Sequence, residues 1–162
     1  MDSKAPGGVQ FTSVISADQK EELEALMFFN ENQAQYRSVV IASIERFGEP
    51  SIKNDGGVLR VRTTRLGEVQ TLFAVEHRLD VPRPIAVAVY ARTAPDTVTL
   101  LHIVVHRDFA ATGPHAGEMV AFRLIQEVAR SVSRIKNVRR MEMLYGTGDG
   151  ATTTMRVGRK SR

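Results

Sequence analysis

The sequence predicts a mixed α/β domain, with one sheet of about six mostly antiparallel strands and helices on both faces. Residues 97–106 form a long apolar run, which is typical of a buried strand. Residues 118–136 place apolar side chains at the three- and four-residue spacing of an amphipathic helix. The other apolar runs are separated by short segments with glycine or proline, and connections of hairpin length favour antiparallel neighbours.

The first element is expected to be a strand, and two helices and a run of strands follow it. Ser16 and Asp18 are candidate N-caps for the first helix, and Gly48 with Pro50 ends the second. The last strand can pair parallel to strand 97–106 through a right-handed crossover. The expected elements, in chain order, are a strand at 9–15, a helix between 16 and 30, a helix at 31–47, strands at 58–64, 69–77, 85–92 and 97–106, a helix at 118–136 and a strand at 139–145.

The length of 162 residues is enough for one well-buried domain and too short for two ordinary ones. We expect a loose arm at 1–8, a single domain at 9–146, and most simply a disordered basic tail at 147–162. No apolar stretch is long enough to span a membrane, and the start of the chain lacks the pattern of a signal peptide.

The absence of cysteine excludes a disulfide framework, a thiol nucleophile and a thiolate metal site, and it suits a cytoplasmic protein. The net charge is +4, with 17 arginines against 5 lysines, which favours an anionic partner such as a nucleotide cofactor. The arginines are spread along the chain, so nucleic acid is the less favoured anionic partner.

A loop with glycine joins strand 97–106 to helix 118–136, and it reads Arg-Asp-Phe-Ala-Ala-Thr-Gly-Pro-His-Ala-Gly. Such a loop is a usual place to hold an anion, because backbone N–H groups and the positive end of the helix dipole point into the same space. Two features oppose this use: Pro114 removes one donor, and Glu118 would repel a pyrophosphate.

The stretch Leu101-His-Ile-Val-Val-His-Arg-Asp-Phe, followed by a loop of small residues, a helix and a strand, resembles the fourth strand, coenzyme A loop and third helix of the GNAT acyltransferase superfamily. The resemblance covers roughly residues 70–145, and the order of elements carries more of it than the loop does. It implies a GNAT-like acyl-CoA N-acyltransferase fold.

In that family the loop reads Gln/Arg-x-x-Gly-x-Gly/Ala. Aligned without a gap, Ala110 takes the Gln/Arg place, Gly113 matches, and His115 stands where a glycine is expected. With an insertion of two residues, Thr112, His115 and Gly117 fill those places instead. Both registers stay open.

The resemblance implies transfer of an acyl group from acetyl-CoA or another acyl-CoA to an unknown amine, by direct attack in a ternary complex and without a metal. The alternative is a GNAT-like scaffold that has lost turnover and serves as a binding module or a dimeric interaction protein. The cofactor-binding residues implied are Ile103, Val104 and Val105 for the pantetheine arm, and Ala110, Ala111, Thr112, Gly113, His115, Ala116 and Gly117 for the pyrophosphate.

Three residues are candidates for proton transfer, each with an ordinary structural alternative. Glu76 could deprotonate the amine or be a solvated strand end; Tyr145 could protonate the leaving thiolate or be a partly buried tyrosine. His102, flanked by Leu100 and Val104, is a general base or a hydrogen-bonded core histidine. It lies about 13 Å along the strand from His106, which is too far for one metal ion.

The chain after residue 145 is too short for the further helix and hairpin of the family. Strand 139–145 would therefore have an unpaired edge, which is an association hazard unless it is covered. Either a short strand at 152–157 covers it or a second subunit does, and we expect a homodimer.

Overall fold

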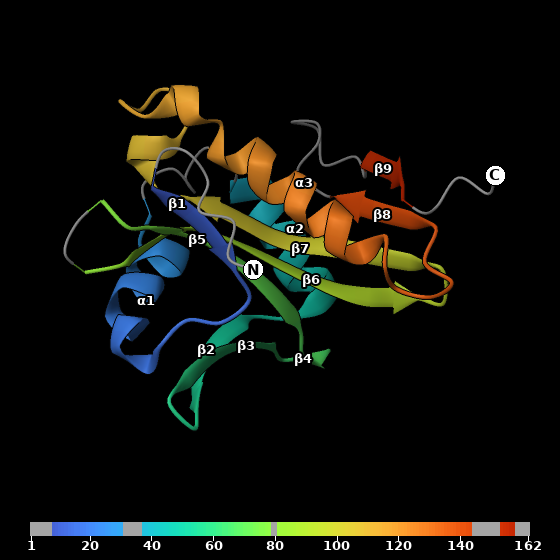
Figure 1. The fold of residues 1–162 in the computed structure, drawn as a ribbon. Coiled ribbons are helices and arrows are strands. Elements are labelled where there is room, and N and C mark those ends of the chain that lie inside the picture. Colours follow the sequence, from blue (N-terminus) through green and yellow to red (C-terminus); the bar gives the residue numbers. More distant parts are fainter. Residues whose placement is uncertain (1–7, 31–36, 79–80, 144–152, 158–162) are drawn as a thin grey trace.

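The structure is a computed structural model that describes residues 8–30, 37–78, 81–143 and 153–157. Its main feature is a six-stranded sheet with the strand order β1-β5-β6-β7-β8-β9, next to a separate three-stranded sheet β2-β3-β4 (Figure 1). The main sheet contains β1 (Val9–Thr12), β5 (Gln70–Glu76), β6 (Arg83–Ala94), β7 (Thr97–Val105), β8 (Arg140–Met143) and β9 (Thr153–Arg156). The smaller sheet contains β2 (Pro50–Asp55), β3 (Val58–Thr63) and β4 (Gly67–Glu68). The α-helices are α1 (Lys20–Phe28), α2 (Arg37–Phe47) and α3 (Val120–Val132).

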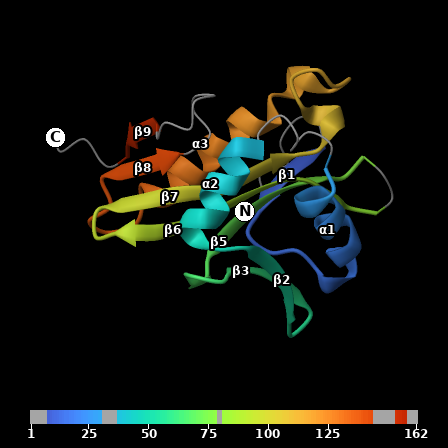
Figure 2. The same cartoon turned by 180° about the vertical axis from the view of Figure 1, so that it is seen from behind.

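Helices cover both faces of the main sheet. Figure 1 shows α3 in front of the sheet, and Figure 2, the view from behind, shows α2 in front of it, with α1 to the right of α2. Two hydrophobic cores result, one between the sheet and α3 and the other on the face of α1, α2 and the smaller sheet. The predicted mixed α/β architecture, with a mostly antiparallel sheet and helices on both faces, is confirmed.

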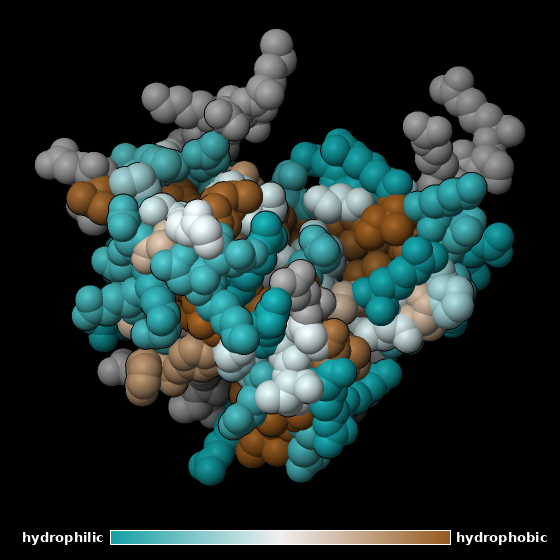
Figure 3. Space-filling model, turned by 90° about the horizontal axis from the view of Figure 1, so that it is seen from below, coloured by the Kyte–Doolittle hydropathy of each residue, from teal (hydrophilic) through white to brown (hydrophobic). Residues whose placement is uncertain are grey.

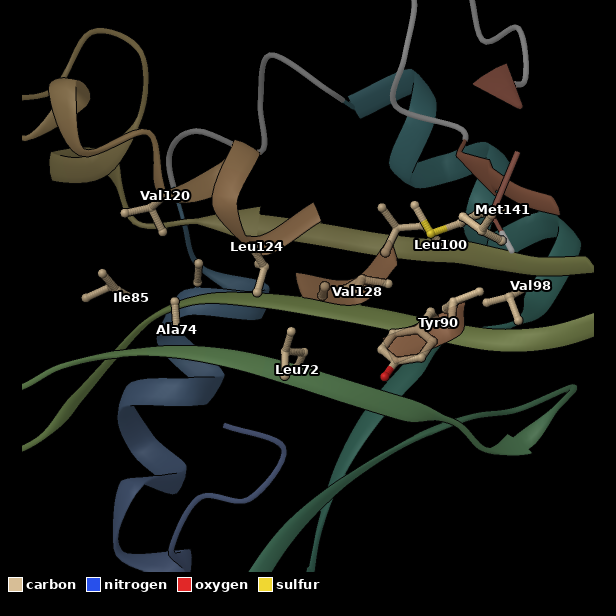
Figure 4. Packing of buried hydrophobic residues seen from close by; sticks show 14 of the residues in the cluster. Leu72, Ala74, Ile85, Tyr90, Val98, Leu100, Val120, Leu124, Val128 and Met141 are labelled. Carbon is tan, nitrogen blue, oxygen red and sulfur yellow. The ribbon is translucent and has the colours of Figure 1, made fainter. Parts of the chain in front are cut away.

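The helix α3 is held by one apolar stripe. Val120, Leu124, Val128 and Val132 are fully buried, at the four-residue spacing that keeps side chains on one face. Figure 4 shows the first three of them above Ile85 and other apolar side chains of the sheet. Each such side chain contributes about 1.5–3 kcal/mol by leaving water, so the stripe fixes the helix firmly on the sheet.

The predicted parallel crossover is present. β8 pairs parallel with β7, and α3 connects them, while β9 pairs antiparallel with the other edge of β8. The edge of β8 is therefore covered by the chain itself, and β9 lies within the segment expected to be a disordered tail. A second subunit is not needed to cover this edge, which removes the physical reason for the expected homodimer; the homodimer itself stays a prediction.

The strand predicted at 58–64 does not join the main sheet. As β3 it pairs with β2, which the sequence did not indicate, and with β4. A two-residue turn of Gly56 (φ +61°) and Gly57 (φ +89°) joins β2 to β3, and two positive φ angles in succession favour glycine. Leu59 and Val61 turn inward from β3 and pack in the core beneath α1.

Candidate functional site

The C-terminal half of β7 has an outer edge that β8 does not reach. The pairing of β7 with β8 ends where Leu100 lies opposite Met143. Beyond this point β7 continues to Val105, paired with β6 on its other side. Residues 101–105 therefore present an edge that no described strand covers.

The backbone groups that face this edge follow from the hydrogen-bond pattern of the ladder. The N–H of His106 donates to the carbonyl of Ile85 at 2.7 Å. Since antiparallel pairs alternate between bonded and non-bonded, Val105 and Ile103 turn their N–H and C=O away from β6. Val104 turns its N–H and C=O toward β6, so its backbone is not available to bind a pantetheine arm at this edge, contrary to the role expected from the sequence.

Two side chains from the α1–α2 region bond to the ends of this edge. Asn30 Nδ2 donates to the carbonyl of Val105 at 2.7 Å, and the hydroxyl of Ser43 donates to the carbonyl of Leu101 at 2.5 Å. Ile103 lies between them, and no described residue hydrogen-bonds to its outward N–H and C=O. One residue of the edge thus offers a donor and an acceptor in extended geometry.

A β-bulge at Leu101 determines where His102 points. His102 lies opposite Val89, whereas Leu100 lies opposite the next residue, Tyr90, so Leu101 is the extra residue. Leu100 packs in the core under α3, and His102 lies beside Ser43 on the other face. The expectation that Leu100 flanks His102 on one face is wrong, because a bulge breaks the alternation of the strand.

His102 is a buried, neutral imidazole. Its exposed fraction is 4%, and burial lowers its pKa to about 4. Its Nε2 lies 3.5 Å from Ser43 Oγ. The hydroxyl proton of Ser43 is already given to the Leu101 carbonyl, so Ser43 Oγ is the acceptor and the imidazole carries its proton on Nε2. This geometry does not activate the serine as a nucleophile.

Glu76 is not a solvated strand end, which was one of the two alternatives for this residue. Only 5% of it is exposed, at the end of β5. Its Oε2 accepts a hydrogen bond from Arg83 Nη2 at 2.7 Å, and its Oε1 lies 3.7 Å from Arg78 Nη1. The carboxylate is therefore buried between two guanidinium groups, because β5 and β6 pair antiparallel and place Glu76 opposite Arg83.

The loop between β7 and α3 uses most of its own N–H groups. Residues whose N–H donates to a carbonyl within the loop are Phe109, Ala110, Gly113, His115, Ala116, Glu118 and Met119. Of the loop residues with a proposed role in binding pyrophosphate, only Ala111, Thr112 and Gly117 keep an N–H for which no described residue is an acceptor. The loop is a compact series of turns, and its available donors are few.

Gly113 is needed for the loop's own packing. A Cβ at this position would lie 2.3 Å from the carbonyl oxygen of Arg107 and 2.5 Å from that of Asp108. A Cβ at Gly117 would meet nothing within 4 Å. The loop glycine that is open to an approaching ligand is therefore Gly117.

The start of α3 has donors of its own. Met119 precedes the helix in the left-handed conformation (φ +50°), and no described side chain caps the helix. The first turn thus leaves N–H groups for which the described residues provide no acceptor. Glu118 is close by, but its Oε1 forms an ion pair with Arg78 and lies 3.5 Å from His115 Nδ1. Arg78 offsets the negative charge that would otherwise repel an anion here.

A pocket of about 280 Å³ adjoins the edge of β7 on the side of α1. Asn30 belongs both to the pocket wall and to the edge, where it bonds to Val105. His106 follows the last residue of β7 and also lines the pocket. The edge, the loop and this pocket together form the candidate site.

Tyr145 lies outside the described residues, so its predicted role stays a prediction. Among the described residues, no group of three His, Asp or Glu side chains is placed to hold a metal ion. Within the same part of the chain, no helix has the length and apolar character that crossing a membrane requires.

Several residues of the site were not identified from the sequence. Asn30 and Ser43 meet β7 from about sixty to seventy-five positions away, a separation that periodicity cannot reveal. Arg83 stands in a Val-Pro-Arg-Pro segment that reads only as a connection. Its position directly before an expected strand, facing a strand that ends in Glu76, was the one available signal.

Comparisons with known proteins give no relative: no family model, no curated protein and no solved structure matches this chain.

Proposed function

We propose that this protein is an acyl-CoA-dependent N-acyltransferase with a GNAT-like fold that acts on an amine. The observation that carries the proposal is the outer edge of β7 beyond the Leu100–Met143 pair. At this edge Ile103 offers one N–H and one C=O in extended geometry. A pantetheine arm consists of amide units, and such units can extend a sheet edge as a peptide strand does.

The topology supports the same proposal by analogy of fold. A strand, two helices, three consecutive antiparallel strands, a helix and a parallel strand follow one another, once the small sheet is counted as an insertion. This is the order of elements that the sequence resemblance implies for GNAT domains. The fold alone does not establish chemistry, so the edge and the loop carry the argument.

The loop and α3 would hold the pyrophosphate. The donors available are the N–H groups of Ala111, Thr112 and Gly117 and those of the first turn of α3. The positive end of the dipole of α3 adds to them. Because Arg78 is paired with Glu118, the nearest carboxylate does not leave an uncompensated negative charge at this position.

In the proposed reaction the unprotonated amine attacks the thioester carbonyl. A C–N bond forms, the C–S bond breaks, and the thiolate leaves as a thiol after taking up a proton. An acceptor that arrives as an ammonium group gives up one proton before the attack; the nitrogen then loses a second proton as the C–N bond forms, and this one balances the proton that the sulfur takes up. The residues lining the pocket beside β7 would orient it, since the pocket and the edge share Asn30.

A second candidate function is binding without turnover. It is favoured by one observation: Glu76 and His102, the bases suggested by the sequence, are both buried and engaged with other residues. A GNAT-like binding module would need no base. The two candidates share the cofactor and differ only in whether acyl transfer occurs.

Two measurements distinguish the candidates. Calorimetry with acetyl-CoA tests the shared site, and a thiol-release assay with a panel of amines tests transfer. The enzyme hypothesis predicts saturable binding and release of coenzyme A that depends on the amine. Binding without thiol release for any amine would favour the binding module, and absence of binding would contradict both.

A further inference from the structure

The pocket beside the β7 edge has a lining with two kinds of surface. Its apolar lining consists of Ala25, Leu26, Pro84 and Phe29, the last with 80% of its surface exposed. Its polar lining consists of Glu22, Asn30, Arg83, His106 and Arg107. Figure 3 shows the underside of the molecule, where brown apolar side chains gather in separate patches among teal hydrophilic ones. The pocket lining thus combines apolar and polar side chains, as small-molecule sites do.

Arg83 contributes more donors than the protein uses. Its Nη2 bonds to Glu76 and 32% of its side chain is exposed, while its Nε is buried and has no acceptor among the described residues. A guanidinium has five N–H donors in a planar fork. Arg83 is therefore oriented by Glu76 and still has donors for a second carboxylate.

His106 adds a neutral donor beside Arg83. Its Nδ1 accepts a hydrogen bond from the N–H of Asp108 at 3.2 Å, so in the neutral ring the proton is on Nε2. Burial and the charges of Arg83 and Arg107 lower its pKa, which favours this neutral form, although Asp108 and Glu76 act in the opposite direction. Together with Arg107, this part of the lining favours negative charge.

The α1 side of the pocket carries the opposite charge. Glu22 is the acidic member of the lining. A phosphate would meet repulsion from Glu22, and a simple cation would meet repulsion from Arg83 and Arg107. A zwitterion suits both ends, with its carboxylate toward the arginines.

We propose that this pocket binds the carboxylate of an apolar α-amino acid at Arg83 and His106, and that the amino group of this ligand is the acyl acceptor. The inference rests on the proposed function for its second half only. The first half, recognition of the carboxylate, is a property of the pocket by itself. Asn30 would then lie between the bound ligand and the edge of β7, where the acyl group is expected.

The test compares two probes that differ in one charge: L-phenylalanine and L-phenylalaninamide, titrated calorimetrically into the full chain. Both keep the amine and the apolar side chain, and the amide lacks the carboxylate. We expect the amino acid to bind at least about tenfold more tightly than the amide, because a charge-assisted pair with a guanidinium is lost. Equal affinities, or no binding of either probe at millimolar concentration, would overturn the proposal.

Variants assign the effect to Arg83. Arg83→Gln is expected to remove the preference for the amino acid, and Arg60→Gln, which changes an arginine on the small sheet, is expected to keep it. Because Arg83→Gln also leaves the buried Glu76 with less compensation, Arg107→Gln serves as the variant of an exposed residue that should fold normally and weaken the preference. A preference that survives in both pocket variants would contradict the assignment. Acetyl-CoA is titrated in a separate experiment. A protein that binds no acetyl-CoA would contradict the proposed function, whereas a protein without the preference for the amino acid would contradict the carboxylate site.

Discussion

Ser43 on α2 and His102 on β7 lie 3.5 Å apart, measured from Oγ to Nε2, and the same hydroxyl donates to the carbonyl of Leu101 at 2.5 Å. This arrangement satisfies the bulged carbonyl and fixes the imidazole at once. It joins α2 to the strand that forms the candidate cofactor edge. The relationship is structural, so its disruption should lower the free energy of unfolding more than it changes the affinity for a ligand.

His102→Ala is expected to lower the free energy of unfolding by about 3 kcal/mol, because it leaves a cavity and removes the donor to Ser43. The affinity for acetyl-CoA should change little. Urea unfolding and calorimetry measure the two effects separately. Ser43→Ala is the matched control and should cost about 1 kcal/mol. A His102→Ala protein that melts like the parent and loses activity would place His102 among the catalytic residues instead.

The pKa of His102 predicts acid sensitivity. The folded-state pKa of about 4 lies below the usual 6.5, so between these values the unfolded chain binds a proton that the folded chain does not. The contribution of His102 to the free energy of unfolding is fully present above pH 6.5 and decreases as the pH falls toward 4. The loss should reach about 2 kcal/mol at pH 5.

Comparing urea unfolding at pH 7 and pH 5 in the parent and in His102→Gln isolates this contribution. The variant should lose less stability over that interval than the parent does. An identical loss in both proteins would show that His102 is not the group responsible.

Substitutions of the two loop glycines should act in different ways. Gly113→Ala and Gly113→Glu should both destabilise the loop, since any Cβ there overlaps main-chain atoms of Arg107 and Asp108. Gly117→Glu should preserve stability and weaken acetyl-CoA binding, because its added charge enters open space at the start of α3. Gly117→Gln controls for size, and equal effects of Glu and Gln at this position would argue against a phosphate there.

The covering role of β9 can be tested by truncation. A chain ending before Thr153 should expose the edge of β8, with Met141 and Met143 beside it, and associate more than the full chain does. Light scattering measures both proteins, for which a monomer of the full chain has a mass of 17.9 kDa. Unchanged mass after truncation would mean that β9 does not protect this edge. The mass of the full chain also tests the expected homodimer.

The sequence predicts those elements whose packing leaves a regular pattern. The stripe of Val120, Leu124, Val128 and Val132 indicates α3, and the apolar run that contains Leu100 and Leu101 indicates β7. β9 was recognised only as the possible cover of the preceding strand. The helix is shorter than the pattern predicts: it begins only after Met119, which has a positive φ angle, and after Val132 the chain continues in tighter turns, in which Arg134 and Ile135 donate to the carbonyls three residues before them.

The remaining features depend on contacts between distant segments. β2 begins with Pro50 and is mostly exposed, so it shows no apolar alternation, and hairpin spacing alone cannot tell which sheet β3 joins. The bulge at Leu101 reverses the side-chain alternation without any glycine or proline to mark it. The ion pairs of Glu76 arise from strand register and could not be derived from spacing along the chain.

The central claim is that the outer edge of β7 binds acyl-CoA, and calorimetric titration of acetyl-CoA into three proteins tests it most directly. The parent and Ile103→Val, which keeps the outward N–H, are expected to bind one acetyl-CoA per chain with similar affinity. Ile103→Pro removes that N–H without touching the ladder to β6 and should lose binding while it stays folded by circular dichroism. No heat from the parent protein with millimolar acetyl-CoA would contradict the account, as would undiminished binding by a folded Ile103→Pro protein.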